Sequence, residues 1–447
     1  MNKDPRIALG QSVGFAAFTW GYPLIESLRT CRLQTTADGS GAAWGAPIDR
    51  LRHTQRVSTD ADRDVVTPAN DLLYTTGWIH LADGPRLLTV PAKARHPGRY
   101  FVLALYDAWT NNFANPGFRE SPAEGETVVL VGPETPADAA LPPGRVIRSP
   151  TNLVWLIGRV LAGAGDDVLA ARALQAEIAL RPLHGTDDGR LPLGVQHWTG
   201  PPEDTMAALL AKPAEAPTIA AAFFTNLCRG LVDQAVPQAD AGLAAWFARA
   251  GLVPSAQFDF AHLPDGTQAG LTQGLVDAAG WIETASRSRR AKPWATNFNI
   301  GRYGSEYLVR ALTAYKGLGA LAGEEAIYAM CDFDAEQRPL DGRRRYLMRF
   351  EPGELPPADG FWSVTMYGAD RFLYANTFGR HSIGDRTPGL TRDADGGLSL
   401  SIGHEAPAEM ANWLPAPAGP CYLVLRLYVP RPEVRTWTAP PLRQPSA

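Results

Sequence analysis

The sequence predicts an α+β protein with two β-rich parts, each an antiparallel sandwich or barrel, and a helical segment between them. Over 57–131, and again over 324–429, β-branched and aromatic residues form short runs bounded by Gly and Pro, as strands do. Over 204–320 the apolar residues instead recur at helical spacing. A chain of 447 residues is also too long for one ordinary core, which favours more than one domain.

The first segment is predicted to be a helix over 7–34, broken near Gly21 and Pro23, because both residue types disfavour a helix interior. Strands follow in "RLLTVPA" and "GRYFVLALYDAW". The run "LVWLIGRVL" is compatible with a strand or a helix. After a Gly turn, Ala170, Leu174 and Ile178 repeat at helical spacing and predict a helix.

Three amphipathic helices are predicted in the middle of the chain: "TIAAAFFTNLCRGLV", "AGLAAWFARAGL" and "GLTQGLVDAAGWIETASRS". The short basic run "SRSRRAK" at the end of the third is interpreted as a solvated helix end. Strands then return in "EAIYAMCDFDAEQRPLDGRRRYLMRF", "FWSVTMYG" and "CYLVLRLYVP". A tight hairpin is predicted in "GLTRDADGGLSLSIG", around its Asp-Gly-Gly turn at 395–397.

The amino-acid composition narrows the classes of molecule that the protein is expected to bind. A net charge of −4 and a pI near 6.1 give no basic footprint for nucleic acid or anionic lipid. No apolar run is long enough to span a membrane, and the N-terminus does not resemble a secretion signal. Four cysteines lie far apart, which suits a reducing cytoplasm without disulfides. We therefore expect a cytoplasmic protein whose partner is a small molecule, not nucleic acid or a membrane.

Several motifs resemble known domains. "FTWGYPLIE", "TPANDLLYTTGWIHL", "GRYFVLALYDAWTNNF" and "SPTNLVWLIGRVL" resemble a DUF1254-type domain. "EEAIYAMCDFDAEQRPLDG", "FWSVTMYGADRFLYANTFGRHSIGDR" and "NWLPAPAGPCYLVLRLYVP" resemble a DUF1214-type domain. The two domain types commonly occur in tandem in this order, and the likeness covers most of the chain outside about 201–294.

The resemblance implies two β-rich, jelly-roll-like sandwich domains arranged side by side. The expected division is a DUF1254-like domain with an N-terminal helix over 1–200, a helical linker over 201–320, and a DUF1214-like domain over 321–447. Both names label domains of unknown function, so the resemblance implies little chemistry. This chain also departs from the usual family loop Pro-Asn-Asn-Asp-Thr, with Ala69 for the first Asn and Leu72 for the Thr, and it has His381 where the family has an aromatic residue. If these positions contact a substrate, that substrate is atypical.

The stretch "PANDLLYTTGW" suggests a turn that leads into a strand. Asn70 and Asp71 are typical of a turn that is capped by its own side chains. On the strand, alternation places Tyr74 and Trp78 on one face, which suits a flat or oxygenated ligand. The alternative is that the stretch is only a turn and a strand start.

The cluster "YDAWTNNF" ends an apolar strand in polar residues. Asp107 is either a solvated strand end or a carboxyl whose pKa is raised by apolar neighbours, as a general acid or base requires. Asn111 and Asn112 have amide N–H groups that can stabilise a developing oxyanion.

In the C-terminal strands, alternation puts Leu423, Leu425 and Leu427 on a core face. Arg426 and Tyr428 then lie on the opposite face. An Arg between apolar strand residues needs a carboxylate partner or an anionic ligand, and the plainer alternative is an ordinary outer face or an internal ion pair.

"YGADRFLYANTFGRHSIGDR" brings Arg380 and His381 together in a loop-rich stretch. No His or Cys spacing predicts a metal site, although ligands from distant strands stay open as an alternative. "GQSVG" matches a hydrolase elbow, but no strand precedes it, so Ser12 is interpreted as part of the first helix. "GLGALAG" over 317–323 is interpreted as a helix C-cap and turn.

The favoured function is a cofactor-independent enzyme, a hydrolase, lyase or isomerase. It would act on a small oxygenated or glycosidic molecule by Asp/Tyr acid–base chemistry in a cleft between the β domains. Asp107 would be the acid or base, Tyr74 and Tyr367 would position or protonate an oxygen, and Arg380 would hold negative charge.

The expected substrate contacts come from both domains. They are Asn70, Trp78, Asn111, Asn112, His381, Arg426 and Tyr428. The alternatives are a non-catalytic binding protein for a carbohydrate or other polar ligand, and a jelly-roll structural or assembly protein that forms a homo-oligomer.

Overall fold

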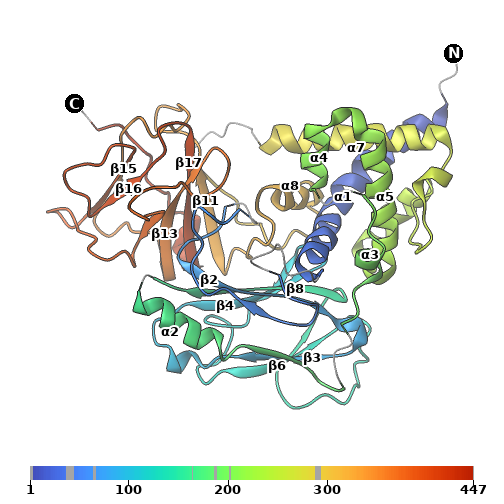
Figure 1. The fold of residues 1–447 in the computed structure, drawn as a ribbon, viewed down its shortest axis with the longest axis horizontal. Coiled ribbons are helices and arrows are strands. Elements are labelled where there is room, and N and C mark those ends of the chain that lie inside the picture. Colours follow the sequence, from blue (N-terminus) through green and yellow to red (C-terminus); the bar gives the residue numbers. More distant parts are fainter. Residues whose placement is uncertain are drawn as a thin grey trace.

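The computed structural model describes residues 4–36, 45–63, 67–163, 165–185, 189–200, 203–286 and 293–445. Over these ranges the chain is a mixed α+β protein with several β-sheets, none of them a closed barrel (Figure 1). The helices are α1 (Pro5–Thr35), α2 (Asp166–Gln175), α3 (Leu193–Gln196), α4 (Thr205–Ala211), α5 (Ala216–Asp233), α6 (Ala241–Ala248), α7 (Asp265–Ser286) and α8 (Tyr307–Gly317).

Two sheets form the N-terminal β part. The five-stranded sheet has the order β1-β2-β8-β4-β5 and the four-stranded sheet has the order β7-β6-β3-β9. Their strands are β1 (Arg52–His53), β2 (Leu72–His80), β3 (Arg86–Val90), β4 (Phe101–Asp107), β5 (Asn112–Ala114), β6 (Glu126–Val131), β7 (Val146–Arg148), β8 (Leu153–Leu161) and β9 (Ala179–Pro182).

One face of β2 joins the core between these two sheets, and the other face packs toward the helices. Leu73 and Ile79 of β2 share a core with Leu88 of β3, so the two sheets lie face to face. Tyr74 and Trp78 belong to the core on the opposite side, which includes residues of α1 and α5. The predicted division of this strand into two faces is confirmed.

Two sheets also form the C-terminal β part. The five-stranded sheet has the order β10-β11-β17-β13-β14 and the three-stranded sheet has the order β12-β15-β16. Their strands are β10 (Trp294–Thr296), β11 (Ala326–Cys331), β12 (Tyr346–Phe350), β13 (Ala358–Gly368), β14 (Ser382–Gly384), β15 (Leu398–Gly403), β16 (Trp413–Pro415) and β17 (Cys421–Pro430).

The core of this part lies on the leucine face of β17. Leu423, Leu425 and Leu427 pack in one cluster with Leu400 of β15 and Met348 of β12, as the alternation predicts. The opposite face of β17 carries Arg426 and Tyr428, since successive side chains of a strand point to opposite sides.

The helix α1 is continuous from Pro5 to Thr35, so the predicted break near Gly21 and Pro23 is wrong. Most of the helix between these ends is buried, and burial of its apolar side chains outweighs the low helix propensity of both residues. Gly21 also makes room for α5, because a Cβ there would come within 2.8 Å of Leu227 Cδ1.

Glycines also bring α1 and α7 close together. Gly10 and Gly14 of α1 face Gly270 and Gly274 of α7, and a Cβ on Gly14 would lie 2.9 Å from the Cα of Leu271. The helix predicted around "GQSVG" is therefore confirmed, and its glycines serve helix packing.

The predicted hairpin around 395–397 is wrong. The turn is present, with the Asp393 amide donating to the Gly397 carbonyl (2.9 Å), but only the arm that follows it is a strand, β15. This strand pairs antiparallel with β12 and parallel with β16. Arg349 of β12 binds the Asp393 carboxylate (2.5 Å), so the incoming arm is held by an ion pair instead of a ladder.

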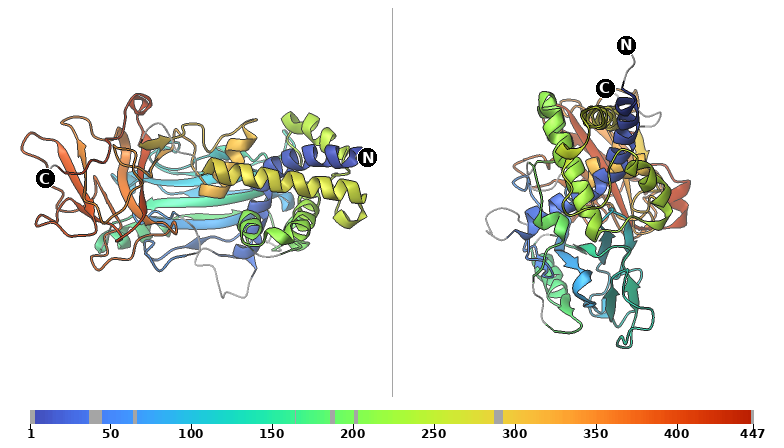
Figure 2. Two further views of the ribbon diagram at one scale, coloured as in Figure 1. Left: turned by 90° about the horizontal axis from the view of Figure 1, so that it is seen from above. Right: turned by 90° about the vertical axis from the view of Figure 1, so that its right-hand side faces the viewer.

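The three parts meet around one face of the five-stranded N-terminal sheet. The C-terminal sheets and the helices α1, α5 and α7 lie on that face, and α8 lies between them (Figures 1 and 2), whereas α2 packs against the core between the two N-terminal sheets. The three predicted middle helices correspond to α5, α6 and α7. Most of the basic run "SRSRRAK" lies outside the described residues, and α7 ends at Ser286. Over the described ranges, no helix is both long and apolar enough to cross a bilayer.

Candidate functional site

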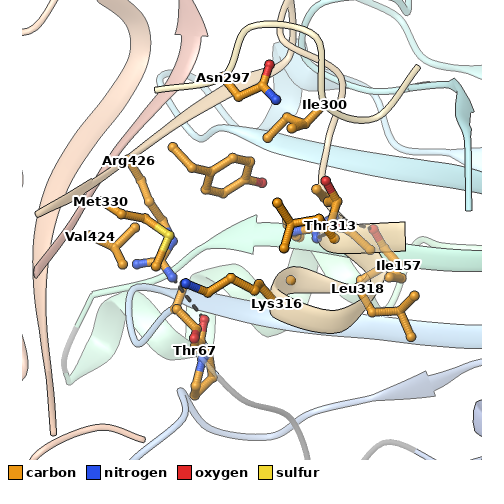
Figure 3. A pocket seen from close by; sticks show the side chains of 18 of the residues that line it. Thr67, Ile157, Asn297, Ile300, Thr313, Lys316, Leu318, Met330, Val424 and Arg426 are labelled. Carbon is orange, nitrogen blue, oxygen red and sulfur yellow. Dashed lines mark hydrogen bonds between the residues drawn. The ribbon is translucent and has the colours of Figure 1, made fainter. Parts of the chain in front are cut away.

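A cavity of about 270 Å³ lies where the two β parts and α8 meet. The N-terminal sheet contributes Tyr74 of β2 and Arg159 of β8, and the C-terminal sheet contributes Arg426 and Tyr428 of β17. The third wall is α8, with Lys316, and the loop that follows it to residue 320. Figure 3 shows side chains from all three walls converging on this space.

Strand register explains why these side chains meet. Tyr74 and Arg159 are directly opposite each other on β2 and β8. Tyr328 of β11 and Ser363 of β13 flank Arg426 on its two neighbouring strands. Side chains that are directly opposite each other in an antiparallel pair lie on the same face of the sheet. The polar side chains of each sheet therefore face the cavity together.

Arg159 is buried, with 8% of its surface exposed. Its guanidinium donates to the carbonyl of Gly319 (2.8 Å), the hydroxyl of Tyr106 (3.2 Å) and the carbonyl of Ile157 (3.3 Å). All three partners are neutral, and among the described residues no carboxylate forms an ion pair with it. Because a guanidinium stays protonated in proteins, Arg159 is a buried positive charge without a counter-charge.

Arg426 is the second buried guanidinium, only 3% exposed. It donates to the Thr365 hydroxyl (3.0 Å), the Thr67 carbonyl (2.9 Å) and the Tyr367 hydroxyl (2.8 Å). Tyr367 in turn donates to the carbonyl of Pro68 (2.6 Å). Arg426 and Tyr367 together hold the segment that precedes β2 against the C-terminal sheet.

The aromatic residues of the cavity add hydrogen-bond donors. Burial raises the pKa of Tyr74 above its ordinary value, and it raises the pKa of Tyr428 further, so both phenols are protonated at neutral pH. Trp155 lines the same space, and its Nε1–H is buried without a partner among the described residues. An indole N–H can only donate.

The charged lining has one sign. Arg159, Lys316 and Arg426 are the charged side chains among the described lining residues, and none of that lining is acidic. Lys316 donates to the carbonyl of Ser286 (2.8 Å). The remaining lining is mostly apolar, including Ile157 and Val424. The cavity therefore has apolar walls, cationic groups and hydrogen-bond donors.

Of the residues predicted from the sequence, Tyr74, Arg426 and Tyr428 line the cavity. Tyr367 lies directly behind Arg426 and is bonded to it. Trp78 lies behind Trp155, with ring centroids 4.8 Å apart and nearly parallel planes, and its Nε1 donates to Gln34 (2.8 Å).

Asp107 and Asn111 are hydrogen-bonded in one turn outside the cavity lining, and Asn112 follows that turn. The Asp107 carboxylate accepts from the amides of Trp109 (2.9 Å) and Asn111 (2.8 Å) and from the Asn111 side chain (2.9 Å). Burial raises the pKa of Asp107 to about 6, against the opposing effect of the Asn111 hydrogen bonds. Asn112 accepts from the amide of Ala322 (2.9 Å) and so joins this turn to the segment before β11.

Asn70 and Asp71 are not the self-capped turn that the sequence predicts. The Asn70 side-chain oxygen and both Asp71 carboxylate oxygens are buried without a regular hydrogen bond to any described residue. Burial raises the pKa of Asp71, while the nearby Ser363 hydroxyl and Arg426 act in the opposite direction. The carboxyl of Asp71 therefore lies between its own backbone amide and the C-terminal sheet, and neither gives it a regular hydrogen bond.

Arg380 and His381 lie in the C-terminal loops, away from the cavity lining. Arg380 donates to the carbonyls of Met410 (2.6 Å), Ala411 (3.2 Å) and Trp413 (2.9 Å) and so ties these loops together. His381 lies with Nδ1 3.0 Å from the Tyr374 carbonyl. The part of the chain that the structure describes holds no group of three His, Cys, Asp or Glu side chains able to bind a metal.

Sequence reasoning missed Arg159, Trp155 and the loop after α8. Arg159 is the single charge in "LVWLIGRVL", the same signal that identifies Arg426. The loop contains Gly319, which has a positive φ of 82°, and a Cβ there would come within 2.6 Å of Ile157 Cδ1. Glycine is needed at this position so that the loop can approach β8 and offer its carbonyl to Arg159.

Comparison with known proteins identifies the two domains. The family "Protein of unknown function (DUF1254)" matches residues 48–182, and "Protein of unknown function (DUF1214)" matches residues 325–432. No curated protein matches the chain.

Two solved structures are similar over nearly the whole chain. The VPA0106 protein from Vibrio parahaemolyticus is 21% identical with a TM-score of 0.72, covering 98% of this chain and 100% of that one, and it supports the fold alone. An uncharacterized protein from Burkholderia cenocepacia is 12% identical with a TM-score of 0.43, over 98% of this chain and 94% of that one, which is too low to support an argument. With both domain matches in tandem and in the expected order, the chain belongs to the family of proteins in which a DUF1254 domain is followed by a DUF1214 domain.

Proposed function

We propose that the protein binds a small organic anion in the cavity between its two β parts. The observation that carries this proposal is Arg159, a buried guanidinium whose partners are all neutral. Burying an unpaired ion costs several kcal/mol even after the protein has relaxed around it. Hydrogen bonds to carbonyl and phenol oxygens reduce that cost but leave the charge in place, whereas an acidic ligand would neutralise it.

The lining suits an anion with an apolar body. The phenols of Tyr74 and Tyr428 and the indole of Trp155 supply donors for carboxylate oxygens, and Ile157 and Val424 supply apolar surface. A cavity of about 150 Å³ holds one benzene molecule. At about 270 Å³, this one therefore has room for on the order of ten non-hydrogen atoms, for example a ring with a short substituent.

Calorimetric titration with 4-methylbenzoate and its neutral amide, 4-methylbenzamide, tests the proposal. The two molecules have nearly the same shape, so a preference for the acid reports on the positive charge of the cavity. We expect the acid to bind at least about tenfold more tightly, which corresponds to about 1.4 kcal/mol. A control variant, Arg343→Met, should bind as the unmodified protein does, because Arg343 is largely exposed and pairs with Asp341. Equal binding of acid and amide, or binding of neither, would contradict the proposal.

Catalysis at the same site is the second candidate. Two fixed guanidinium groups and protonated phenols can stabilise negative charge as it develops on a substrate oxygen. This supports a hydrolase, lyase or isomerase in which Arg159, Arg426 and Tyr428 act on the substrate. The acid–base role of Asp107 stays a prediction, because the hydrogen bonds of its carboxylate lie within its own turn and it does not line the cavity. Proton NMR of a bound acid during long incubation with the protein would separate turnover from binding.

Three further expectations concern the architecture of the β parts, the cellular location and the oligomeric state. We infer that each β part is a jelly-roll-like sandwich, supported by the apolar cores that lie between its paired sheets. A cytoplasmic location is supported by the four cysteines, which are buried and free. Assembly into a homo-oligomer stays a prediction.

A further inference from the structure

We infer that the ligand carries two acidic groups, one for Arg159 and one for Arg426, with an apolar segment between them. This inference rests on the proposed function and narrows it from an organic anion to a small dianion, such as a dicarboxylic acid. It is carried by the separate anchoring of the two guanidinium groups and by the charge of the lining.

The two guanidinium groups are held toward opposite sides. Arg159 lies on β8, and its side chain reaches Tyr106 on the next strand, β4, and the carbonyl of Gly319. Arg426 lies on β17, and its side chain reaches Thr365 and Tyr367 on β13. One arginine is therefore fixed by the N-terminal sheet and the loop after α8, and the other by the C-terminal sheet.

Tyr74 lies near both arginines. Its backbone is directly opposite Arg159, while its hydroxyl accepts from the amide of Ala69 (3.1 Å). Ala69 belongs to the same short segment as Thr67, whose carbonyl accepts from Arg426. Both arginines oppose the effect of burial on the pKa of the Tyr74 phenol, so both lie near this side chain, and each guanidinium is fixed by its own set of partners.

Much of the lining between the two ends is apolar, together with the polar side chains of Thr313 and Lys316. Ile157, whose carbonyl accepts from Arg159, lines the cavity on one side with Leu318, and Met330 and Val424 line it beside Arg426 (Figure 3). An aliphatic or aromatic segment fits this middle region better than a polar one, because it offers few partners for hydroxyl groups.

The cationic side chains of the cavity lining also suit a ligand with two negative groups. Three cationic side chains line the cavity, and a monoanion can pair with at most one of the two buried guanidinium groups. Asp71 is the acid that lies near Arg426, but its carboxylate oxygens make no regular hydrogen bond to a described residue and it does not line the cavity. Asp71 therefore offsets the charge of Arg426 only in part.

The test compares matched acids in the unmodified, full-length protein. Terephthalate is compared with 4-methylbenzoate as a rigid pair, and pimelate with heptanoate as a flexible pair, by calorimetric titration near neutral pH. We expect the diacid of at least one pair to bind about tenfold or more tightly than its monoacid, as for a second buried charge pair. In Arg159→Met and in Arg426→Met this preference should fall to about threefold or less, while Arg343→Met keeps it.

The outcomes distinguish this inference from the proposed function. If monoacids bind and neither diacid binds more tightly, the protein holds an organic anion but the inference of two acidic groups is wrong. If no acid binds, the proposed function fails and the inference fails with it. The preference in the unmodified protein decides the question even if an arginine variant does not fold, and a thermal melt of each variant identifies that case.

Discussion

Replacing Arg159 with Met separates two roles that this side chain can have. If Arg159 has only a structural role, its three hydrogen bonds outweigh the cost of burying its charge, and the variant should unfold more easily by roughly 3 kcal/mol or more. If Arg159 binds a ligand, the cost of burying its unpaired charge nearly equals what the hydrogen bonds contribute, and the two effects of the substitution nearly cancel. We expect the second result, a change of the unfolding free energy of the ligand-free protein within about 1 kcal/mol.

The same variant should bind 4-methylbenzoate about 30-fold more weakly, a loss of about 2 kcal/mol, because a buried charge pair is broken. At a ligand concentration of 100 times the dissociation constant of the unmodified protein, the ligand stabilises that protein by about 2.7 kcal/mol. By the same relation the variant gains only about 0.9 kcal/mol. Urea unfolding with and without ligand measures both quantities. A strongly destabilised variant that keeps full ligand stabilisation would refute the reasoning.

Three further perturbations test other parts of the structure. Burial raises the pKa of Asp107 from its ordinary 3.8 to about 6, so its contribution to stability is complete below about pH 4 and is lost as the pH rises through 6. Asp107→Asn should remove this pH-dependent loss of about 3 kcal/mol. Urea unfolding that shows the same pH dependence in both proteins would contradict this expectation. Asp71→Asn removes the acid beside Arg426 and should tighten 4-methylbenzoate binding by roughly fivefold in a titration, since no carboxylate then competes for that guanidinium. Gly274→Ala places a methyl group against the backbone of α1 at Gln11 and should lower the unfolding free energy by about 1–3 kcal/mol. An unchanged melting temperature would show that the two helices can move apart at no cost.

Much of the fold was predictable because local patterns and tertiary packing agree. The leucines of β17 alternate with Arg426 and Tyr428, and the structure places them on the two faces that the alternation predicts. The prediction failed where packing overrides local preference. Gly21 and Pro23 have poor helix propensity, but they lie in a helix surrounded by other elements, and local propensity carries no information about that environment.

The site was predictable only in part, for a related reason. Tyr74, Arg426 and Tyr428 were identifiable as polar residues on the regular face of a strand. Asp107 has the composition of a catalytic acid, but whether its carboxylate is used by its own turn depends on backbone geometry that no spacing reveals. Arg159 is also identifiable, as the single charge in an apolar run, but the lack of a neighbouring carboxylate among the described residues can be seen only in three dimensions.

The tandem arrangement of the two domains follows from how the cavity is built. Arg426 belongs to the DUF1214 domain, yet one of its hydrogen bonds goes to Thr67 in the DUF1254 domain. Arg159 belongs to the DUF1254 domain, yet its shortest hydrogen bond goes to Gly319, in the segment between the two matched regions. Each positive group of the proposed site is therefore oriented in part by a contact outside its own domain. A separated domain would keep one arginine but lose one of the three hydrogen bonds that orient it, so the complete site requires both domains.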